Sequence, residues 1–482
     1  MNPRKTFLFG LYVIVLIFVV SEFVPGGTMI GNFTIQSPDY RSWFQLDTTK
    51  YKDISAIIAS VDTTDFQATV TVPENLTPDN KVDSVQQSNN PDTPADNFYP
   101  FEFPPDQDTL LFPFFRSLTR MHLRNRPIRI LHYGDSQIEG DRITSTIRNH
   151  IHRNHGGQGI GFLPIVPVAR VAITFQRDVS QNWKRFSMLD RGIDTIVRNN
   201  RFGISGNFVR YLPANSEDSV ARIRLLPYYS GYRNEQTFTN VRLYYGQGQE
   251  PFTVIVNQNV SQILQPQNSV SSTLWKFDAA QNSFDLQLVS SHLPDIYGIA
   301  LDGERGVAVD NLPLRGSAGL NFSRNDREQM RQMFLIMDVE ILILQFGANA
   351  VSARLENYDT YARNFERQLR HLKSLKPGLA IIVVSVNDMS QNTPSGYVSF
   401  PNIEKMRDAQ KQAAFEAGCV FWDLYEAMGG ENSMPSWALA KPPLAQKDFV
   451  HFTPAGAKIV GELFCKAWAN EYQRFSFSNN NI

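Results

Sequence analysis

The stretch "ILHYGDSQIEGDRIT", residues Ile130–Thr144, decides how the fold of this chain is interpreted. In it, an apolar run ends in Gly134, Asp135 and Ser136, and a helix-forming segment follows. In open α/β sheets, the residues that do chemistry lie at the carboxyl ends of the strands. A serine at this place is a candidate nucleophile if a histidine lies close enough to take its proton.

Strand and helix patterns alternate on the C-terminal side of the chain. This alternation predicts a parallel sheet that is covered by helices on both faces, and therefore an α/β fold. The predicted strands cover residues 128–134, 339–347, 379–388 and 419–425, and the predicted helices cover residues 139–155, 355–378, 404–418 and 454–475.

The pattern changes between about residue 166 and residue 302, where short strand-like runs are separated by Asn, Gln, Ser and Gly. Such spacing is typical of a β-sandwich, so we expect a sandwich inserted into the α/β domain. Aromatic residues of this region could stack on sugar rings, although burial in the sandwich core is the favoured alternative for more than half of them; they are Trp183, Tyr228, Tyr229 and Trp275.

The N-terminus carries an export pattern. Arg4 and Lys5 precede the apolar segment 7–24, whose uninterrupted part runs for about 15 residues, the usual length of a signal-peptide core. An uncleaved membrane anchor is slightly favoured over a cleaved signal, because no convincing cleavage site follows. Either alternative predicts the cell envelope or periplasm, with the protein anchored in the inner membrane or secreted. Residues 1–25 form this segment, and the polar, proline-rich residues 26–106 are predicted to be a linker or arm.

Composition excludes several classes of protein. The 46 Lys and Arg residues balance 47 Asp and Glu residues, and the net charge of −1 argues against a general nucleic-acid binder. The two cysteines, Cys419 and Cys465, provide neither a disulfide framework nor a CxxC metal site. Two buried free thiols are the favoured interpretation, although their spacing leaves a pairing open. A zinc site at the histidines 150, 152 and 155 is improbable, because only 152 and 155 are neighbours on the helix and no third ligand is in view. No metal and no organic cofactor is implied by the sequence.

Among the eight histidines, His451 has the most informative surroundings. Asp448 precedes it by three residues, and a helix begins at Pro454. On a short turn the Asp448 carboxylate can reach Nδ1 of the imidazole and hold the tautomer whose Nε2 accepts a serine proton. Such a histidine base predicts that kcat/KM rises with pH through the neutral range.

Four short blocks in sequence order resemble those of SGNH (GDSL-type) hydrolases: "GDSQ" at 134–137, "RGSAG" at 315–319, "GAN" at 347–349 and "DFVH" at 448–451. The resemblance implies a flavodoxin-like three-layer α/β/α domain, formed by residues 107–165 and 303–478 and interrupted by the β-sandwich at 166–302. It also implies that Ser136 is the nucleophile, His451 the general base and Asp448 its orienting carboxylate. The implied oxyanion hole consists of the N–H groups of Ser136 and Gly316 and the side-chain amide of Asn349.

The architecture is similar to that of peptidoglycan O-acetylesterases of the same class. The inserted region, the phrase "GGQGIGFLP" at 156–164 and the export segment carry this resemblance. It implies that the insertion resembles a carbohydrate-binding module. One departure affects the pocket, because the family often has a histidine where this chain has Gln137.

The sequence therefore predicts an exported serine carboxylic-ester hydrolase that removes O-acetyl groups from a polysaccharide, with peptidoglycan as the leading candidate. The expected partners are the O-acetylated polysaccharide and, through the N-terminal segment, a membrane; the oligomeric state is left open. One alternative is a polysaccharide O-acetyltransferase that uses the same triad. Another is a non-catalytic carbohydrate-binding protein of the cell envelope.

Overall fold

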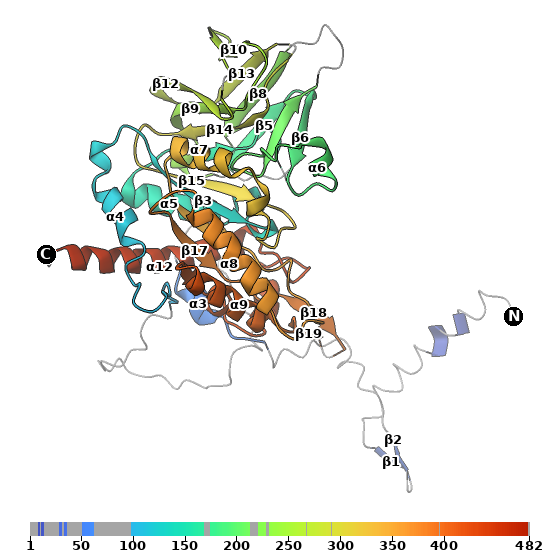
Figure 1. Cartoon of the computed structure of the whole chain (residues 1–482). Helices are drawn as coiled ribbons and strands as arrows, with labels where there is room; N and C mark the ends of the chain where they lie inside the picture. Colours follow the sequence, from blue (N-terminus) through green and yellow to red (C-terminus); the bar gives the residue numbers. More distant parts are fainter. Residues whose placement is uncertain are drawn as a thin grey trace.

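A computed structural model shows how these segments are arranged (Figure 1). The structure describes residues 8–9, 11–13, 28–30, 33–35, 51–61, 98–167, 174–212, 220–227, 231–266, 268–290, 292–394 and 396–480. Most of the predicted export segment 7–24 and of the predicted arm lies outside these residues. Within the described residues, no helix is both long enough and apolar enough to cross a membrane.

A five-stranded parallel sheet forms the centre of the α/β domain. Its strand order is β15-β3-β16-β17-β20, which is the order 2-1-3-4-5 of flavodoxin-like folds when the strands are numbered along the chain. The predicted fold class is confirmed. The strands are β3 (Ile128–Gly134), β15 (Val307–Pro313), β16 (Val339–Gln345), β17 (Ala380–Val384) and β20 (Val420–Trp422).

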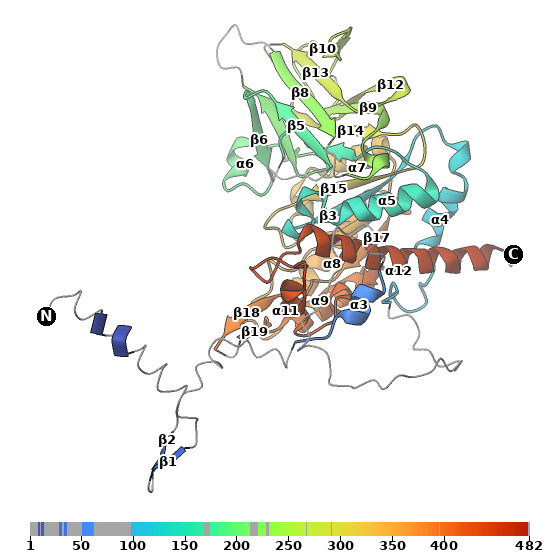
Figure 2. The same ribbon diagram turned by 180° about the vertical axis from the view of Figure 1, so that it is seen from behind.

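Helices cover both faces of this sheet because its strands are apolar on both sides. On one face Ile130 and Ile343 pack with α5 and α12, and on the other face Leu131 and Leu344 pack with α7, α8 and α9. Figure 1 shows α8 and α9 on the near side of the sheet, and Figure 2 shows α5 and α12 from behind. These helices are α5 (Thr144–His155), α7 (Arg327–Met337), α8 (Asp359–Lys373), α9 (Ile403–Glu416) and α12 (Pro454–Asn480).

The shorter helices belong to the α/β domain and its N-terminal arm, except α6, which lies in the inserted region. Helix α4 begins at Phe112, so Pro113 lies in its first turn. It does not interrupt the helix there, because the N–H that a proline lacks is unpaired at this position anyway. Helix α5 begins at Thr144 rather than at the predicted Glu139, because Gly140 adopts a left-handed φ of 69° within the preceding turn. The other helices are α3 (Ser55–Ala59), α4 (Phe112–Thr119), α6 (Ile193–Ile196), α10 (Leu424–Ala427) and α11 (Ser433–Leu439).

Two antiparallel sheets lie above the parallel sheet in Figure 1. One has the order β11-β10-β13-β8-β5; the other has the order β12-β9-β14-β7-β6, and β4 pairs with β14. Their strands are β4 (Gly161–Leu163), β5 (Phe175–Val179), β6 (Trp183–Ser187), β7 (Asn207–Tyr211), β8 (Val220–Pro227), β9 (Phe238–Tyr245), β10 (Phe252–Val256), β11 (Val260–Leu264), β12 (Ser271–Gln281), β13 (Phe284–Val289) and β14 (Ile296–Asp302).

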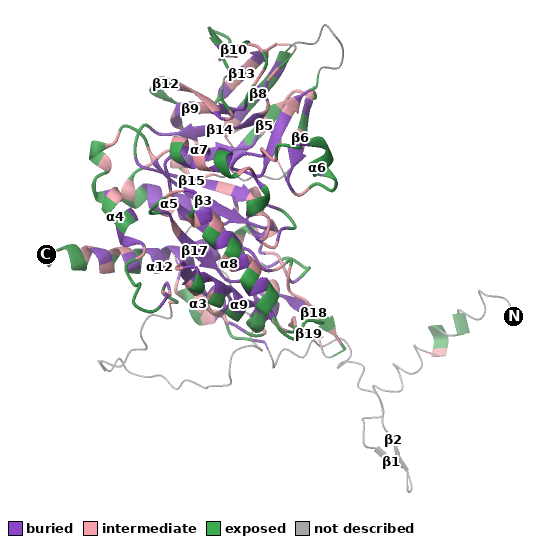
Figure 3. Ribbon diagram, in the orientation of Figure 1, coloured by how far each residue is buried: buried purple, intermediate pink, exposed green. Residues whose placement is uncertain are grey.

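The β-sandwich is packed on the α/β domain through a shared core. Its two sheets enclose residues such as Ile223, Val241 and Leu286. The opposite face of the β9-containing sheet contributes Tyr244 and Ala300 to the core that also holds α7 and α8. Figure 3 shows this continuity as buried residues running from the parallel sheet into the sandwich. Trp183 and Trp275 lie in the sandwich core, whereas Tyr228 and Tyr229 lie outside the described residues.

Parts of the predicted N-terminal arm pack on the α/β domain. Ile54 and Phe101 are buried, and Glu102 forms an antiparallel bridge with Phe421 at the edge of the parallel sheet. Two further strand pairs are antiparallel: β1 (Thr28–Ile30) with β2 (Phe33–Ile35), and β18 (Ser390–Thr393) with β19 (Gly396–Ser399). The predicted domain boundaries stay predictions.

Candidate active site

Three loops meet at the carboxyl edge of the parallel sheet because their strands end in register. Gly134 at the end of β3 lies between Pro313 of β15 and Gln345 of β16. The Leu314 N–H donates to the Gly134 carbonyl over 2.7 Å, and the Asp135 N–H donates to the Gln345 carbonyl over 3.2 Å. The blocks that contain Ser136, Gly316 and Asn349 therefore start side by side.

Gly134 is needed where β3 turns into the serine loop. A Cβ at this position would lie 2.9 Å from the Gln345 carbonyl oxygen and 3.0 Å from the Ile138 side chain. After the turn, the Asp135 carboxylate accepts the Gln137 N–H over 3.0 Å and begins the short helix η3 (Ser136–Asp141). Ser136 is thus presented at a helix start, partly exposed above the sheet.

The structure brings Ser136 and His451 together across 315 residues of sequence. Ser136 Oγ lies 2.8 Å from His451 Nε2. On the other side of the ring, His451 Nδ1 lies 2.8 Å from Asp448 Oδ2. The geometry is that of a nucleophile, a base and an orienting carboxylate in hydrogen-bonding sequence.

The Asp448 carboxylate is well supplied with donors although it is half exposed. Burial alone would raise its pKa, but the hydrogen bonds from the His451 ring and from the N–H groups of His451 and Val450 outweigh burial and hold the pKa below its ordinary value. Both backbone bonds go to Oδ1 at 3.0 Å. The carboxylate therefore stays ionised and orients the histidine over the neutral range.

The loop that carries His451 turns sharply at Phe449 and is supported by the β18–β19 hairpin. Phe449 adopts a left-handed φ of 56°, which is unusual for an aromatic residue. Its ring stacks on Tyr397 of β19 with the ring centroids 3.6 Å apart, and its carbonyl accepts the Ser390 N–H of β18 over 2.9 Å. The β18–β19 hairpin thus supports the turn between Asp448 and His451.

The two other predicted oxyanion donors lie at the same edge of the sheet. Gly316 is exposed at a φ of 78°, and a Cβ there would meet nothing within 4 Å, so the backbone angle rather than crowding favours glycine. The Asn349 amide nitrogen donates to Asp135 Oδ2 and to the Ser317 carbonyl, both over 3.2 Å. These bonds are at the long end of the range, and one of them has to be released before that amide can face an oxyanion.

Asp135 is a site residue that sequence reasoning did not assign. It is 1% exposed, and burial raises its pKa to about 6 against the hydrogen bonds from Gln137 and Asn349. It connects the start of the serine helix to the Asn349 amide. Its place in the sequence between Gly134 and Ser136 was the signal that could have identified it as a site residue.

Gln137 and Arg142 join the serine loop to the histidine loop. Gln137 is 2% exposed, donates to the Val450 carbonyl over 2.7 Å and accepts the Phe452 N–H over 3.4 Å. Arg142 donates to the Ser136 carbonyl over 2.5 Å and to the Phe452 carbonyl over 2.9 Å. Val450 and Phe452 are the neighbours of His451 in the chain. The bonds from Gln137 and Arg142 therefore fix the backbone on both sides of His451 and help to position its ring relative to Ser136.

The polar residues that follow β17 have a structural role. Asn387 accepts a hydrogen bond from Gln137 over 3.1 Å. Asp388 is fully buried and accepts the Ser399 hydroxyl over 2.6 Å and the Met434 N–H over 2.8 Å. It ties the end of β17 to the β18–β19 hairpin and to α11.

The remaining histidines do not join this site. His132 is buried within β3 between Gln345 and Thr144, and burial lowers its pKa to about 3. His152 is likewise buried on α5. Among the described residues, no group of three or more His, Cys, Asp or Glu side chains could hold a metal ion.

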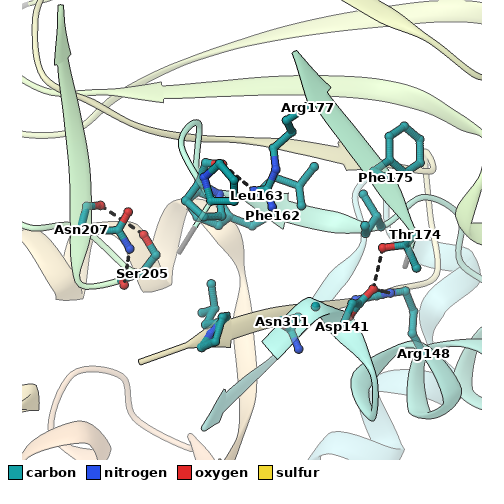
Figure 4. A pocket seen from close by; sticks show the side chains of 16 residues that line it. Asp141, Arg148, Phe162, Leu163, Thr174, Phe175, Arg177, Ser205, Asn207 and Asn311 are labelled. Atoms are coloured by element: carbon teal, nitrogen blue, oxygen red, sulfur yellow. Dashed lines mark hydrogen bonds and ion pairs between the residues drawn. The ribbon is translucent and has the colours of Figure 1, made fainter. Parts of the chain in front are cut away.

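A small cavity of about 50 Å³ lies between the serine loop and the inserted sheets (Figure 4). Gly140 and Pro313 line it from the α/β side, and Phe175 and Arg177 line it from the sandwich. Figure 4 shows Asp141 in the wall, bonded to both Arg148 and Thr174. The insertion therefore borders the space next to the serine loop.

Comparison with known proteins identifies the domain. Residues 287–459 match the model of the GDSL-like Lipase/Acylhydrolase family. The chain carries an SGNH, or GDSL-type, hydrolase domain. The matched part of this SGNH domain includes the Gly316, Asn349, Asp448 and His451 blocks, whereas Ser136 precedes it on the other side of the insertion.

A solved structure shares this architecture. The chain is 17% identical, with a TM-score of 0.59, to the structure "Peptidoglycan O-acetylesterase in action, 5 min", over 76% of this chain and 96% of that one. That similarity shows the fold. A family two carbohydrate esterase from Cellvibrio japonicus is 6% identical, with a TM-score of 0.25, over 62% of this chain and 98% of that one, which is too loose to carry an argument. No curated protein matches the chain significantly.

Proposed function

We propose that this SGNH protein is an exported serine esterase that removes O-acetyl groups from a polysaccharide, with peptidoglycan as the first substrate to test. The observation that carries the proposal is the pair of 2.8 Å contacts linking Ser136, His451 and Asp448. The shared architecture with a solved peptidoglycan O-acetylesterase supports the choice of substrate. Export rests on Arg4, Lys5 and the apolar segment 7–24 of the sequence.

In the proposed reaction, Ser136 Oγ attacks the acetyl carbonyl carbon while His451 Nε2 takes the serine proton. The tetrahedral oxyanion faces the N–H groups of Ser136 and Gly316 and the Asn349 amide. When the C–O bond to the sugar breaks, His451 returns the proton to the sugar oxygen. Water then attacks the acetyl-enzyme, with His451 again as base, and acetate leaves.

The Asn349 amide gives the proposal a specific electrostatic step. In the free protein it donates to Asp135 and to the Ser317 carbonyl. Release of one long bond in favour of a short bond to the oxyanion occurs only when charge develops on the substrate. Such a donor stabilises the transition state more than the ground state, and removal of one donor typically costs about 3 kcal/mol in the barrier.

The test is acetate release from O-acetylated peptidoglycan, acetylated xylan and p-nitrophenyl acetate. Ser136→Ala is expected to lower kcat by about 10⁴-fold or more on every substrate that the wild type hydrolyses. Ser478→Ala, an exposed hydroxyl near the end of α12, is the matched control and keeps wild-type turnover. Near wild-type turnover by Ser136→Ala would remove Ser136 as the nucleophile.

Acetyl transfer is distinguished in the same assay. An esterase releases acetate at the same rate with or without an added acceptor oligosaccharide. If acetate appears only on the acceptor sugar, the acetyl-enzyme is protected from water and the protein is a transferase.

A further inference from the structure

A second groove lies at the opposite end of β3 from Ser136. It is formed between the loop that precedes β3, the C-terminal end of α7 and the face of β9 and β12 that carries Tyr244 and Leu274. Its volume is about 200 Å³. We call it the cationic groove; its lining includes Arg126, Arg129, Asn240, Arg242, Lys276 and Asp302.

The strand register places two of the cations next to each other. Arg242 of β9 pairs with Leu274 of β12, and Asn240 pairs with Lys276, so these side chains form one ladder on the same face. Arg242 donates to the Ser272 hydroxyl over 3.1 Å. Neither Arg242 nor Lys276 has a carboxylate within ion-pair distance among the described residues.

Acidic side chains near the groove are already occupied. Asp302 lies 2.5 Å from Arg129, which also binds Asp310. Arg126 is half exposed and shares Asp338 with Arg124 and Lys376. The groove therefore presents an excess of positive charge to a ligand.

Two buried polar atoms in the lining have no partner among the described residues. They are Nε of Arg129 and Oδ1 of Asp302, whose side chains are 3% and 9% exposed. Buried polar atoms without partners are rare in folded proteins and call for an explanation. One is a donor and the other an acceptor, and this is the combination that a hydroxyl group satisfies.

A stacking platform for neutral sugars is not evident in the sandwich. No Phe, Tyr or Trp side chain in the described part of residues 174–302 is exposed. Trp183 and Trp275, which the sequence offered as candidates, are buried in its core. The cationic groove offers charge and hydroxyl contacts to a glycan instead.

We propose that the cationic groove binds an acidic polysaccharide, a sugar chain that carries carboxylates. Arg242 and Lys276 bind the carboxylates, and the Arg129–Asp302 pair takes a sugar hydroxyl. This inference depends on the proposed function in one respect, which is that the substrate of the protein is a glycan. Seven residues along the chain separate Arg129 from Ser136, and five of these steps lie in β3, so the distance is at most about 23 Å at 3.3 Å per residue. A chain of several sugars spans this distance, so the groove anchors the polymer away from the ester being cleaved.

The experiment measures binding of the full-length protein to unacetylated polygalacturonate by affinity electrophoresis and calorimetry. The variant Arg242→Gln with Lys276→Gln is expected to weaken binding by about tenfold or more, because it removes both unpaired cations. The matched control is Arg363→Gln with Lys405→Gln, which removes the same charge from α8 and α9 and leaves binding unchanged. Turnover of p-nitrophenyl acetate stays at the wild-type level in both variants.

Three outcomes with polygalacturonate and dextran would overturn the proposal. Absence of binding to polygalacturonate, equal affinity in the groove variant, or equal binding of neutral dextran would each do so. Binding of polyphosphate in place of polygalacturonate would assign the groove to phosphate polymers. Because the probe has no acetyl ester, a protein that binds it through the groove yet hydrolyses no ester would refute the proposed function and leave this inference standing.

Discussion

At the scale of single residues, the site depends on how His451 is held. Its ring is placed between Ser136 and Asp448 by bonds that other side chains make to its own loop. Gln137 and Arg142 bind backbone groups on both sides of it. The chemistry that a short motif suggests therefore relies on neighbours that the motif does not contain.

The first prediction concerns the base and its carboxylate. His451→Ala is expected to lower kcat/KM for p-nitrophenyl acetate nearly as much as Ser136→Ala, because members of a triad act as a unit. Asp448→Asn is expected to cost a similar or smaller amount, on the order of 10³-fold, because the amide still accepts the loop N–H groups but no longer accepts from Nδ1. Undiminished activity in His451→Ala would point to a different base.

The second prediction concerns Gln137 as a positioning residue. Gln137→Ala removes the acceptor of the Phe452 N–H and the shorter of the two hydrogen bonds to the Val450 carbonyl, which keeps only the bond from Asn387 over 3.2 Å. We expect a fall in kcat on the order of tenfold, with KM for p-nitrophenyl acetate nearly unchanged.

Gln137→His is the conservative comparison, since a ring N–H can donate to the Val450 carbonyl, and it is expected to restore part of kcat. Thermal unfolding of the three proteins separates positioning from a general loss of stability. Wild-type kcat in Gln137→Ala would show that the loop holds His451 by itself.

At the scale of elements, the β18–β19 hairpin and α11 depend on one buried carboxyl group. Burial raises the pKa of Asp388 to about 6, against hydrogen bonds from Ser399, Met434, Met389 and Ser433. Because this pKa lies above the ordinary value of 3.8, the group adds stability at low pH. That contribution is lost as the pH rises through about 6.

The third prediction follows from this loss of stability with rising pH. Asp388→Asn is neutral at every pH, so its unfolding free energy should fall less than that of the wild type between pH 4.5 and 7.5. We expect the two falls in unfolding free energy to differ by on the order of 2 kcal/mol, since one pKa unit corresponds to about 1.4 kcal/mol. Part of the wild-type contribution is already lost at pH 4.5, because this pH lies above the ordinary pKa of 3.8. Urea unfolding at several pH values measures it, and parallel curves for the two proteins would contradict the assigned pKa.

At the scale of the whole molecule, the insertion is built into the α/β domain. Arg148 of α5 is fully buried and binds Asp141 and Glu235, each over 2.7 Å. Glu235 belongs to the inserted region, and it also accepts the Ser145 hydroxyl over 2.8 Å. The shared apolar core around Tyr244 and these buried charges make the two regions one structural unit.

The fourth prediction tests this connection. Arg148→Met leaves two buried carboxylates without their cation and is expected to destabilise the protein by about 3–5 kcal/mol. Arg148→Met combined with Glu235→Gln removes one of these charges and should recover part of the loss. Chemical unfolding measures both.

The control for this prediction is Arg331→Met, which breaks an exposed pair with Glu328 on α7 and changes stability little. Wild-type stability in Arg148→Met would show that the insertion and the α/β domain are held together by the apolar core alone.

The sequence by itself determined the parts of this protein that depend on local patterns. Strand and helix periodicity placed β3, β16 and α8, and an apolar strand that ends in Gly-Asp-Ser indicated the edge of the sheet that carries the candidate site. The contact between Asp448 and His451 was also predictable, because three residues on one turn bring the two side chains together. Core burial was expected for more than half of the four candidate aromatic residues, and the structure shows it for Trp183 and Trp275, while Tyr228 and Tyr229 lie outside the described residues.

Only the tertiary structure decided what depends on partners far apart in the chain. Contacts across hundreds of residues bring Ser136 to His451, join Gln137 to the histidine loop and enclose Arg148 between two regions. The cationic groove also forms only where α7 meets the sandwich. The physical reason is that periodicity reports which face of an element is apolar, whereas the partner of a buried polar group is set by how the elements pack.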